Sequence, residues 1–136
     1  MQANKIWHVS NLYTIPEQEL LAKKLCELSF AEKVFFCNSG AEAVEGAIKI
    51  ARKWGYEKKG IQKNSAKIIF PEGNFWGRTL AAISSSTDPS SYNGFGPFMP
   101  GYDIIPYNDL VVLEKKFQLQ MYFPLLLIVI LITLYF

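Results

Sequence analysis

The feature that most constrains this chain is an apolar run that breaks at a small polar turn and then continues as a helix, from Val34 to Ala43. Branched and aromatic residues in succession are typical of a strand that is buried on both faces. Apolar residues then recur at helical spacing, at Ala43, Val44, Ala47, Ile48, Ala51 and Trp54. The pattern predicts a strand over residues 33–37 and a helix from Gly40 to about Trp54, ended by a left-handed Gly55.

The turn before this helix has two interpretations, which the residues alone leave open. The backbone N–H groups of Gly40 and Ala41 would be first-turn donors at the positive end of the helix, where a phosphate could bind. However, Ser39 and Glu42 also have the spacing of a capping box, which begins many helices that bind no ligand.

Four further segments complete an α/β pattern. They are a helix from about 14 to 28 with Thr14 and Glu17 as a capping box around Pro16, a strand over 66–70, a strand over 102–106, and a helix from Asp109 to about Lys116. A strand, a helix and a second strand form the crossover unit of a parallel sheet. The first helix has one leucine stripe and is expected to pack on another element.

Residues 83–101 are too rich in serine, glycine and proline for regular structure, by this interpretation. Long loops inside compact domains are usually functional or disordered. Interleaved aromatic side chains, such as Tyr92 and Phe98, favour an ordered loop that packs on another surface.

Residues 71–79 follow the carboxyl end of the second predicted strand, where open α/β sheets bind their ligands. Phe75 or Trp76 could offer a flat face to a ring, and Arg78 could bind a carboxylate through its guanidinium. The alternative is that the aromatics fill the core and Arg78 pairs with an acid of the protein. Successive crossovers leave such turns on one edge, so residues 39–41 and 75–78 are expected to face one cavity.

The charge pattern excludes some functions. A formal net charge of +2, with no basic cluster longer than a pair, provides no surface for nucleic acid. A single histidine, His8, excludes a metal site that needs two imidazoles, and no metal site is predicted.

Residues 117–136 carry no charged side chain. A helix of about 20 apolar residues reaches about 30 Å and could cross a bilayer, and Lys115 and Lys116 would flank such an anchor. The other interpretation of residues 118–136 is a frameshifted or non-coding read-through. We therefore expect a partial domain over residues 1–117 and a hydrophobic tail over residues 118–136.

Several strings resemble the class-III aminotransferases, which use pyridoxal phosphate. Residues 7–13 and 36–43 are similar to acetylornithine aminotransferases, whereas residues 73–79 through to 106–109 are similar to ornithine aminotransferases. The resemblance covers roughly residues 6–117. It implies part of the large domain of a fold-type I pyridoxal-phosphate-dependent transferase, an incomplete parallel or mixed sheet with flanking helices.

The resemblance also implies roles for individual residues. Ser39, Gly40 and Ala41 would hold the cofactor phosphate, Phe75 would stack on the pyridine ring, Arg78 would bind a substrate carboxylate, and Tyr13 would line the substrate pocket. The implied activity transfers an amino group from ornithine to 2-oxoglutarate. Acetylornithine is the alternative substrate, and arginine and proline metabolism is the implied setting. Family members are homodimers of the cytoplasm or the mitochondrial matrix.

The departures from the family matter as much as the matches. Family chains are much longer, and the lysine that forms their Schiff base has no counterpart here. No catalytic residue is therefore assigned, and the chain is expected to be an inactive internal fragment. A second hypothesis is a catalytically dead remnant tethered to a membrane through residues 118–136.

Overall fold

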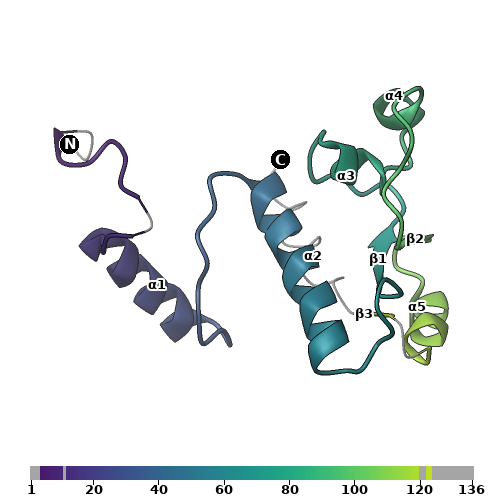
Figure 1. Ribbon diagram of the computed structural model, residues 1–136, viewed down its shortest axis with the longest axis horizontal. Helices are drawn as coiled ribbons and strands as arrows, with labels where there is room; N and C mark the ends of the chain where they lie inside the picture. Colours follow the sequence, from purple (N-terminus) through teal and green to yellow (C-terminus); the bar gives the residue numbers. More distant parts are fainter. Residues whose placement is uncertain (1–3, 11, 120–121, 124–136) are drawn as a thin grey trace. The chain divides into compact units, whose positions relative to one another are not determined.

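The computed structural model describes residues 4–10, 12–119 and 122–123 (Figure 1). The chain divides into two compact units, residues 1–36 and residues 37–136, and each is described by itself. Within the described ranges, no helix has both the length and the apolar character needed to cross a bilayer. Residues 124–136, on which the membrane-anchor interpretation depends, lie outside these ranges.

The first unit contains one helix, α1, Pro16–Leu28. Its extent matches the prediction, but the predicted capping box is wrong, because Ile15 is the N-cap and no side chain caps the helix. A proline at the first helical position forces the preceding residue into the extended conformation. That preceding residue is Ile15, which has no side-chain oxygen, and Thr14 lies one position too early.

The leucine stripe of α1 lies on the surface of this unit. Leu20 is 68% exposed and Leu28 is 73% exposed, and α1 has no buried residue. The first unit therefore does not supply the packing partner that the stripe predicts.

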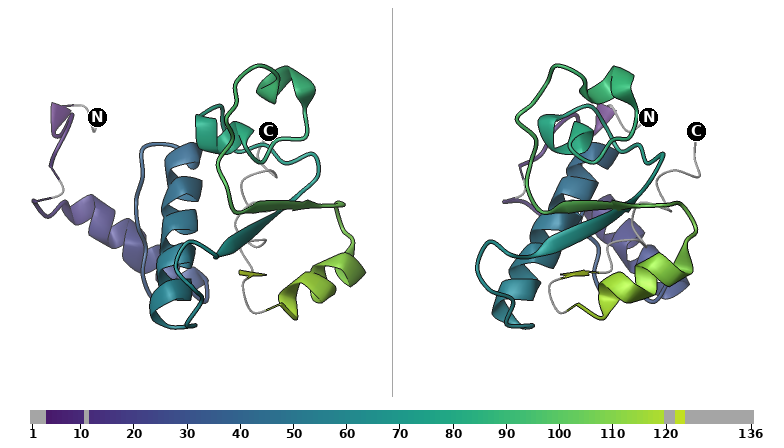
Figure 2. Two further views of the ribbon diagram at one scale, coloured as in Figure 1. Left: turned by 45° about the vertical axis from the view of Figure 1, so that its right-hand side comes forward. Right: turned by 90° about the vertical axis from the view of Figure 1, so that its right-hand side faces the viewer.

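The second unit is built on a sheet of three strands, β1 (Lys67–Pro71), β2 (Tyr102–Ile105) and β3 (Tyr122–Phe123), in the order β2-β1-β3. β1 is parallel to both neighbours, with Ile68 opposite Tyr102 on one side and Phe123 on the other. Figure 2 shows β1 and β2 side by side. The two later predicted strands and their parallel pairing are confirmed.

The strand predicted over residues 33–37 is wrong, since these residues form no strand. A strand needs a neighbour for its backbone N–H and C=O groups. Ile68 pairs with β2 on one side and with β3 on the other, so β1 has no free edge at that residue. The parallel connection that the structure contains runs from β1 to β2.

The long helix of the second unit, α2, spans Gly40–Glu57. It passes through Gly55, so the predicted end at that glycine is wrong. The N–H of Lys58 bonds to the carbonyl of Trp54 at 2.8 Å and continues the helical hydrogen bonding. The left-handed glycine comes later, at Gly60, where φ is +73°.

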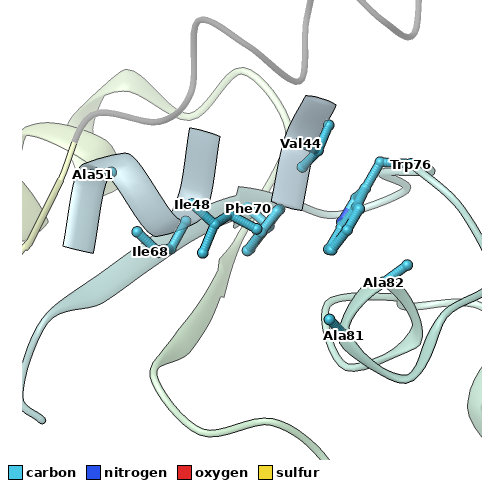
Figure 3. Close-up of a cluster of buried hydrophobic side chains, with 8 residues drawn as sticks. All are labelled: Val44, Ile48, Ala51, Ile68, Phe70, Trp76, Ala81 and Ala82. Atoms are coloured by element: carbon cyan, nitrogen blue, oxygen red, sulfur yellow. The ribbon is translucent and has the colours of Figure 1, made fainter. Parts of the chain in front are cut away.

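The sheet is covered on both faces. On one face, α2 and the segment after β1 form a cluster of buried side chains, shown in Figure 3: Val44, Ile48, Ala51, Ile68, Phe70, Trp76, Ala81 and Ala82. Because strand side chains alternate, Ile69 lies on the opposite face. There it packs with Ile105, Val112 and Leu113, the last two from α5 (Leu110–Phe117). Helices on both faces of a parallel sheet confirm the predicted α/β class.

The segment between β1 and β2 is mostly irregular, but it contains two four-residue helices, α3 (Leu80–Ile83) and α4 (Pro89–Tyr92). The prediction that residues 83–101 contain no regular structure is therefore wrong at α4. Asp88 caps α4 and Pro89 suits its first position.

The end of the loop contacts α2, but its aromatic side chains stay partly exposed, with Phe95 at 57% and Phe98 at 47%, so their packing on another surface stays a prediction. Arg52 of α2 donates to the carbonyl of Pro100 at 2.9 Å and lies 5.4 Å from the ring centroid of Tyr102. Within the loop, the rings of Tyr92 and Phe98 meet edge to face.

The phenol of Tyr102 should make stability fall at alkaline pH. Its hydroxyl is buried without a hydrogen-bond partner, and burial raises its pKa from 10.0 to about 12. In the interval between these values the unfolded chain loses the proton first. The stabilisation by the neutral phenol is therefore complete below pH 10 and is lost as the pH rises towards 12.

Urea unfolding at increasing pH measures this effect. Tyr102→Phe should reduce the fall in the free energy of unfolding over this pH interval, and Tyr92→Phe should not. Equal declines in all three proteins would contradict this assignment to Tyr102.

Candidate functional site

The turn before α2 contains both features that its sequence suggests. The Ser39 Oγ accepts from the N–H of Glu42 at 3.2 Å, and the Glu42 carboxylate accepts from the N–H of Asn38 at 2.7 Å, which is a capping box shifted by one residue, because its second bond goes to the residue before the N-cap. In the described part of the chain, the N–H groups of Gly40 and Ala41 have no partner. The capping box and an anion site therefore use different donors, and Ser39 keeps its hydroxyl proton to donate.

The segment after β1 lies directly against this turn. A Cβ atom built on Gly77 would be 3.1 Å from the Cβ of Ala41 and 3.7 Å from the Cβ of Ala82. Gly77 also has φ of +142°, a conformation that other residues rarely adopt. The absence of a side chain at Gly77 allows this close approach of residue 77 to the first turn of α2. The expected route to it, a strand over residues 33–37 in the same sheet, does not form, and one cavity facing both segments stays a prediction.

The two neighbouring aromatic residues of this segment differ in burial. Trp76 is 3% exposed and stacks on Phe70, with ring centroids 5.9 Å apart and 8° between the planes. Phe75 is 55% exposed. Trp76 therefore belongs to the core, and Phe75 is the ring with a free face.

A buried polar cluster that sequence reasoning missed contains the residues on either side of Phe75. The indole N–H of Trp76 donates to the Ser85 Oγ at 2.7 Å, and the Asn74 amide donates to the carbonyls of Pro71 and Ser85 at 2.8 and 2.7 Å. Ser85 is fully buried. In the sequence, Asn74 looks like a turn residue and Ser85 is one of three adjacent serines, so neither predicts burial.

Arg78 is exposed and lines a cavity of about 620 Å³ with Leu80, Ile83, Ser91 and Phe95, among others. No acid in the described ranges pairs with its guanidinium. Arg78 thus has both space beside it and an available charge, which suit a carboxylate ligand.

The polar side of this cavity includes two serines next to Asp88. Hydrogen bonds from Ser90 and then from Ser91 lower the pKa of Asp88 below its ordinary value. These bonds hold the start of α4 in place.

Tyr13 belongs to the first unit. There it is 69% exposed and lines a separate hollow of about 350 Å³ with Ser10, Ile15 and Phe35. Its role in a substrate pocket stays a prediction.

Comparison with known proteins identifies a family and several relatives. The family described as "Aminotransferase class-III" matches residues 1–123, a range that continues past the predicted boundary at residue 117 and includes β3. The mitochondrial ornithine aminotransferase of Rattus norvegicus is 66% identical over 86 residues. An acetylornithine aminotransferase of Agrobacterium fabrum is 52% identical over 113 residues.

Solved structures of the same two enzymes resemble the fold. The ornithine aminotransferase of Toxoplasma gondii, with pyridoxal phosphate at partial occupancy in its active site, has a TM-score of 0.84 and 40% identity over 89% of this chain. The acetylornithine aminotransferase of Elizabethkingia anophelis has a TM-score of 0.67 and 43% identity over the same share.

The chain matches only part of each relative. The match to the rat protein spans 63% of this chain and 20% of the rat protein, and the match to the Agrobacterium protein spans 83% of this chain and 28% of that protein. The matches to the two solved structures span 29% of each of those chains.

Proposed function

Because this chain belongs to the class-III aminotransferase family, we propose that its second unit supplies the phosphate-binding and ring-stacking part of an ornithine-type aminotransferase. The observation that carries the proposal is the approach of Gly77 to Ala41, since it joins two segments that are far apart in the sequence. The cofactor of this family is pyridoxal phosphate.

The residues at the turn fit a phosphate group. The N–H groups of Gly40 and Ala41 and the hydroxyl of Ser39 are three donors at the positive end of an 18-residue helix. A side chain at residue 77 would crowd Ala41, and Gly77 avoids this crowding beside the turn. Ser39, Gly40 and Ala41 would thus hold the phosphate through charge-assisted hydrogen bonds.

Phe75 and Arg78 would act on the ring and on the substrate. The exposed face of Phe75 would cover the pyridine ring and exclude water from one side of it. The guanidinium of Arg78 would bind and orient a carboxylate of the amino-acid or 2-oxo-acid substrate. The bound cofactor supplies the electron sink that amino transfer requires.

Binding to the 136-residue chain tests this proposal. Pyridoxal phosphate should bind at least about tenfold more tightly than pyridoxal, since each charge-assisted hydrogen bond is worth about 1.5–3 kcal/mol. Ser39→Ala should reduce the difference in affinity between pyridoxal phosphate and pyridoxal. Ser65→Ala, at an unrelated turn, should leave this difference unchanged. Titration calorimetry measures the affinities of both compounds for the three proteins, and equal affinities of the unmodified chain for the two compounds would contradict the phosphate site.

The amino donor that we propose is ornithine, with acetylornithine as the alternative. The rat ornithine aminotransferase is 66% identical over its 86 aligned residues, whereas the Agrobacterium acetylornithine aminotransferase is 52% identical over a longer stretch of 113 residues. The proposed acceptor is 2-oxoglutarate, and the proposed assembly is the homodimer of the family.

The 136-residue polypeptide alone should show no measurable ornithine transaminase activity. Three lysines of the second unit lie away from the site: Lys49 and Lys53 are more than two turns inside α2, and Lys67 begins β1 at the end opposite to the one that leads to Gly77. None of these three lysines would bond the cofactor or move the substrate's α-proton. A coupled assay on purified protein measures this, and turnover that Arg78→Ala abolishes would overturn the prediction.

A further inference from the structure

The residues on either side of Phe75 are both tied to one buried serine. Trp76 donates its indole N–H to the Ser85 Oγ at 2.7 Å, and the Asn74 Oδ1 lies 3.1 Å from the same Oγ. The Asn74 amide also donates to the Ser85 carbonyl at 2.7 Å. The side chain of Ser85 therefore bonds to residues 74 and 76, and its backbone carbonyl bonds to residue 74 as well.

This double attachment determines which way Phe75 faces. Asn74 is 8% exposed and Trp76 is 3% exposed, while Phe75 between them is 55% exposed. The side chains of residues 74, 75 and 76 thus alternate between the core and the surface. Anchoring residues 74 and 76 in the core therefore turns the ring of Phe75 outward, and Gly77 then follows against Ala41.

The cluster is also costly to break, which makes it a firm support. The Ser85 hydroxyl accepts from Trp76 and has a proton for either the Asn74 Oδ1 at 3.1 Å or the Ala82 carbonyl at 3.0 Å. Because these groups are buried, removing the Ser85 hydroxyl would leave the indole N–H or the amide oxygen without a hydrogen bond, and no solvent water would replace it.

We propose that Ser85 is a positioning residue for the cofactor ring, acting through Asn74 and Trp76 to hold Phe75 in a stacking orientation. This inference rests on the proposed function of Phe75, but it assigns a new role to a residue that touches neither cofactor nor substrate. Ser85 holds the ring face in place, and Ser39, Gly40 and Ala41 hold the phosphate independently of it.

A double-mutant cycle on the full chain tests the inference, with pyridoxal phosphate and inorganic phosphate as separate probes. Ser85→Ala and Phe75→Ala should each weaken pyridoxal phosphate binding about tenfold, which corresponds to about 1.4 kcal/mol and to the upper range for an aromatic contact. The double variant should bind no more weakly than either single variant. Inorganic phosphate affinity should change less than about twofold in all three.

Ser84→Ala is the matched control. The Ser84 hydroxyl also makes two hydrogen bonds, donating to the Leu80 carbonyl at 2.6 Å and accepting from the Met99 N–H at 2.8 Å, but it contacts neither neighbour of Phe75. Its removal should leave both affinities unchanged. If Ser85→Ala does not fold, Trp76→Phe replaces it. This variant keeps an aromatic ring beside Phe70 and removes the indole donor together with the five-membered ring of the indole. It should weaken pyridoxal phosphate binding about threefold.

The outcomes separate this inference from the proposed function. If Phe75→Ala weakens pyridoxal phosphate binding and neither Ser85→Ala nor Trp76→Phe does, the positioning role is wrong. Additive losses in the double variant, or an equal loss for inorganic phosphate, would also overturn it. If the unmodified chain binds pyridoxal phosphate no more tightly than inorganic phosphate, and Phe75→Ala changes neither affinity, the proposed function itself fails.

Discussion

Replacing Gly77 by alanine is expected to lower the free energy of unfolding by about 2–4 kcal/mol and to abolish pyridoxal phosphate binding. The backbone at Gly77 has φ of +142°, and holding a non-glycine residue there costs about 1–3 kcal/mol. The new methyl group would also lie 3.1 Å from the Cβ of Ala41, and such crowding adds about 1 kcal/mol or more. Relief of this crowding would push residues 75–78 away from the phosphate turn.

Gly73→Ala separates the two causes. Gly73 also has positive φ, +73°, but a Cβ there would meet no atom within 4 Å. Its replacement should cost only the conformational strain, about 1–2 kcal/mol, and should leave binding intact. Urea unfolding and calorimetric titration of both variants measure the difference. Equal losses of binding would show that the contact of Gly77 with Ala41 does not shape the site.

Phe70→Ala is expected to cost about 3–5 kcal/mol, the range for removing a large aromatic from a core. Phe70 is fully buried in the middle of β1, where it stacks on Trp76 and meets the ring of Tyr102 edge to face at 4.8 Å. Its loss would open a cavity under the segment that presents Phe75. A domain of this size is stabilised by only about 5–15 kcal/mol, so the variant should be largely unfolded at moderate urea concentrations.

The matched comparison is Phe75→Ala, which removes the same side chain five positions later. Because Phe75 is 55% exposed, its replacement should cost less than about 1 kcal/mol while it weakens pyridoxal phosphate binding. Denaturant unfolding monitored by circular dichroism measures the loss of stability in both variants. A loss for Phe75→Ala as large as that for Phe70→Ala would mean that the ring is structural and would argue against the stacking role.

Local patterns predicted most of the elements that the structure contains. Helical spacing and the Ser39 cap place the start of α2, and Asp109 caps α5 by accepting from the N–H of Val112 at 2.9 Å. Branched residues place β1 and β2 within a residue of their observed ends. These features depend on neighbours within about four positions, so a linear pattern is enough to predict them.

Element ends and strand pairing were less predictable. The helix end expected at Gly55 comes at Glu57, and the first left-handed glycine after it is Gly60, because a buried glycine inside a long amphipathic helix does not have to end it. Residues 33–37 have the composition of a strand but pair with no strand in the described part of the chain, where the sheet has the order β2-β1-β3. Strand formation depends on a distant segment, and composition alone does not identify it.

The sequence by itself determined the donors and charges of the site: a helix start with Ser39 and Gly40, an aromatic pair, and Arg78 after a buried strand. Only the tertiary structure decided that Trp76 is buried and Phe75 exposed, and that Ser85 joins the residues on either side of that ring. It also decided that Gly77 approaches Ala41. The physical reason is that side-chain chemistry is a local property, whereas burial and contact depend on which distant residues fill the space around a side chain.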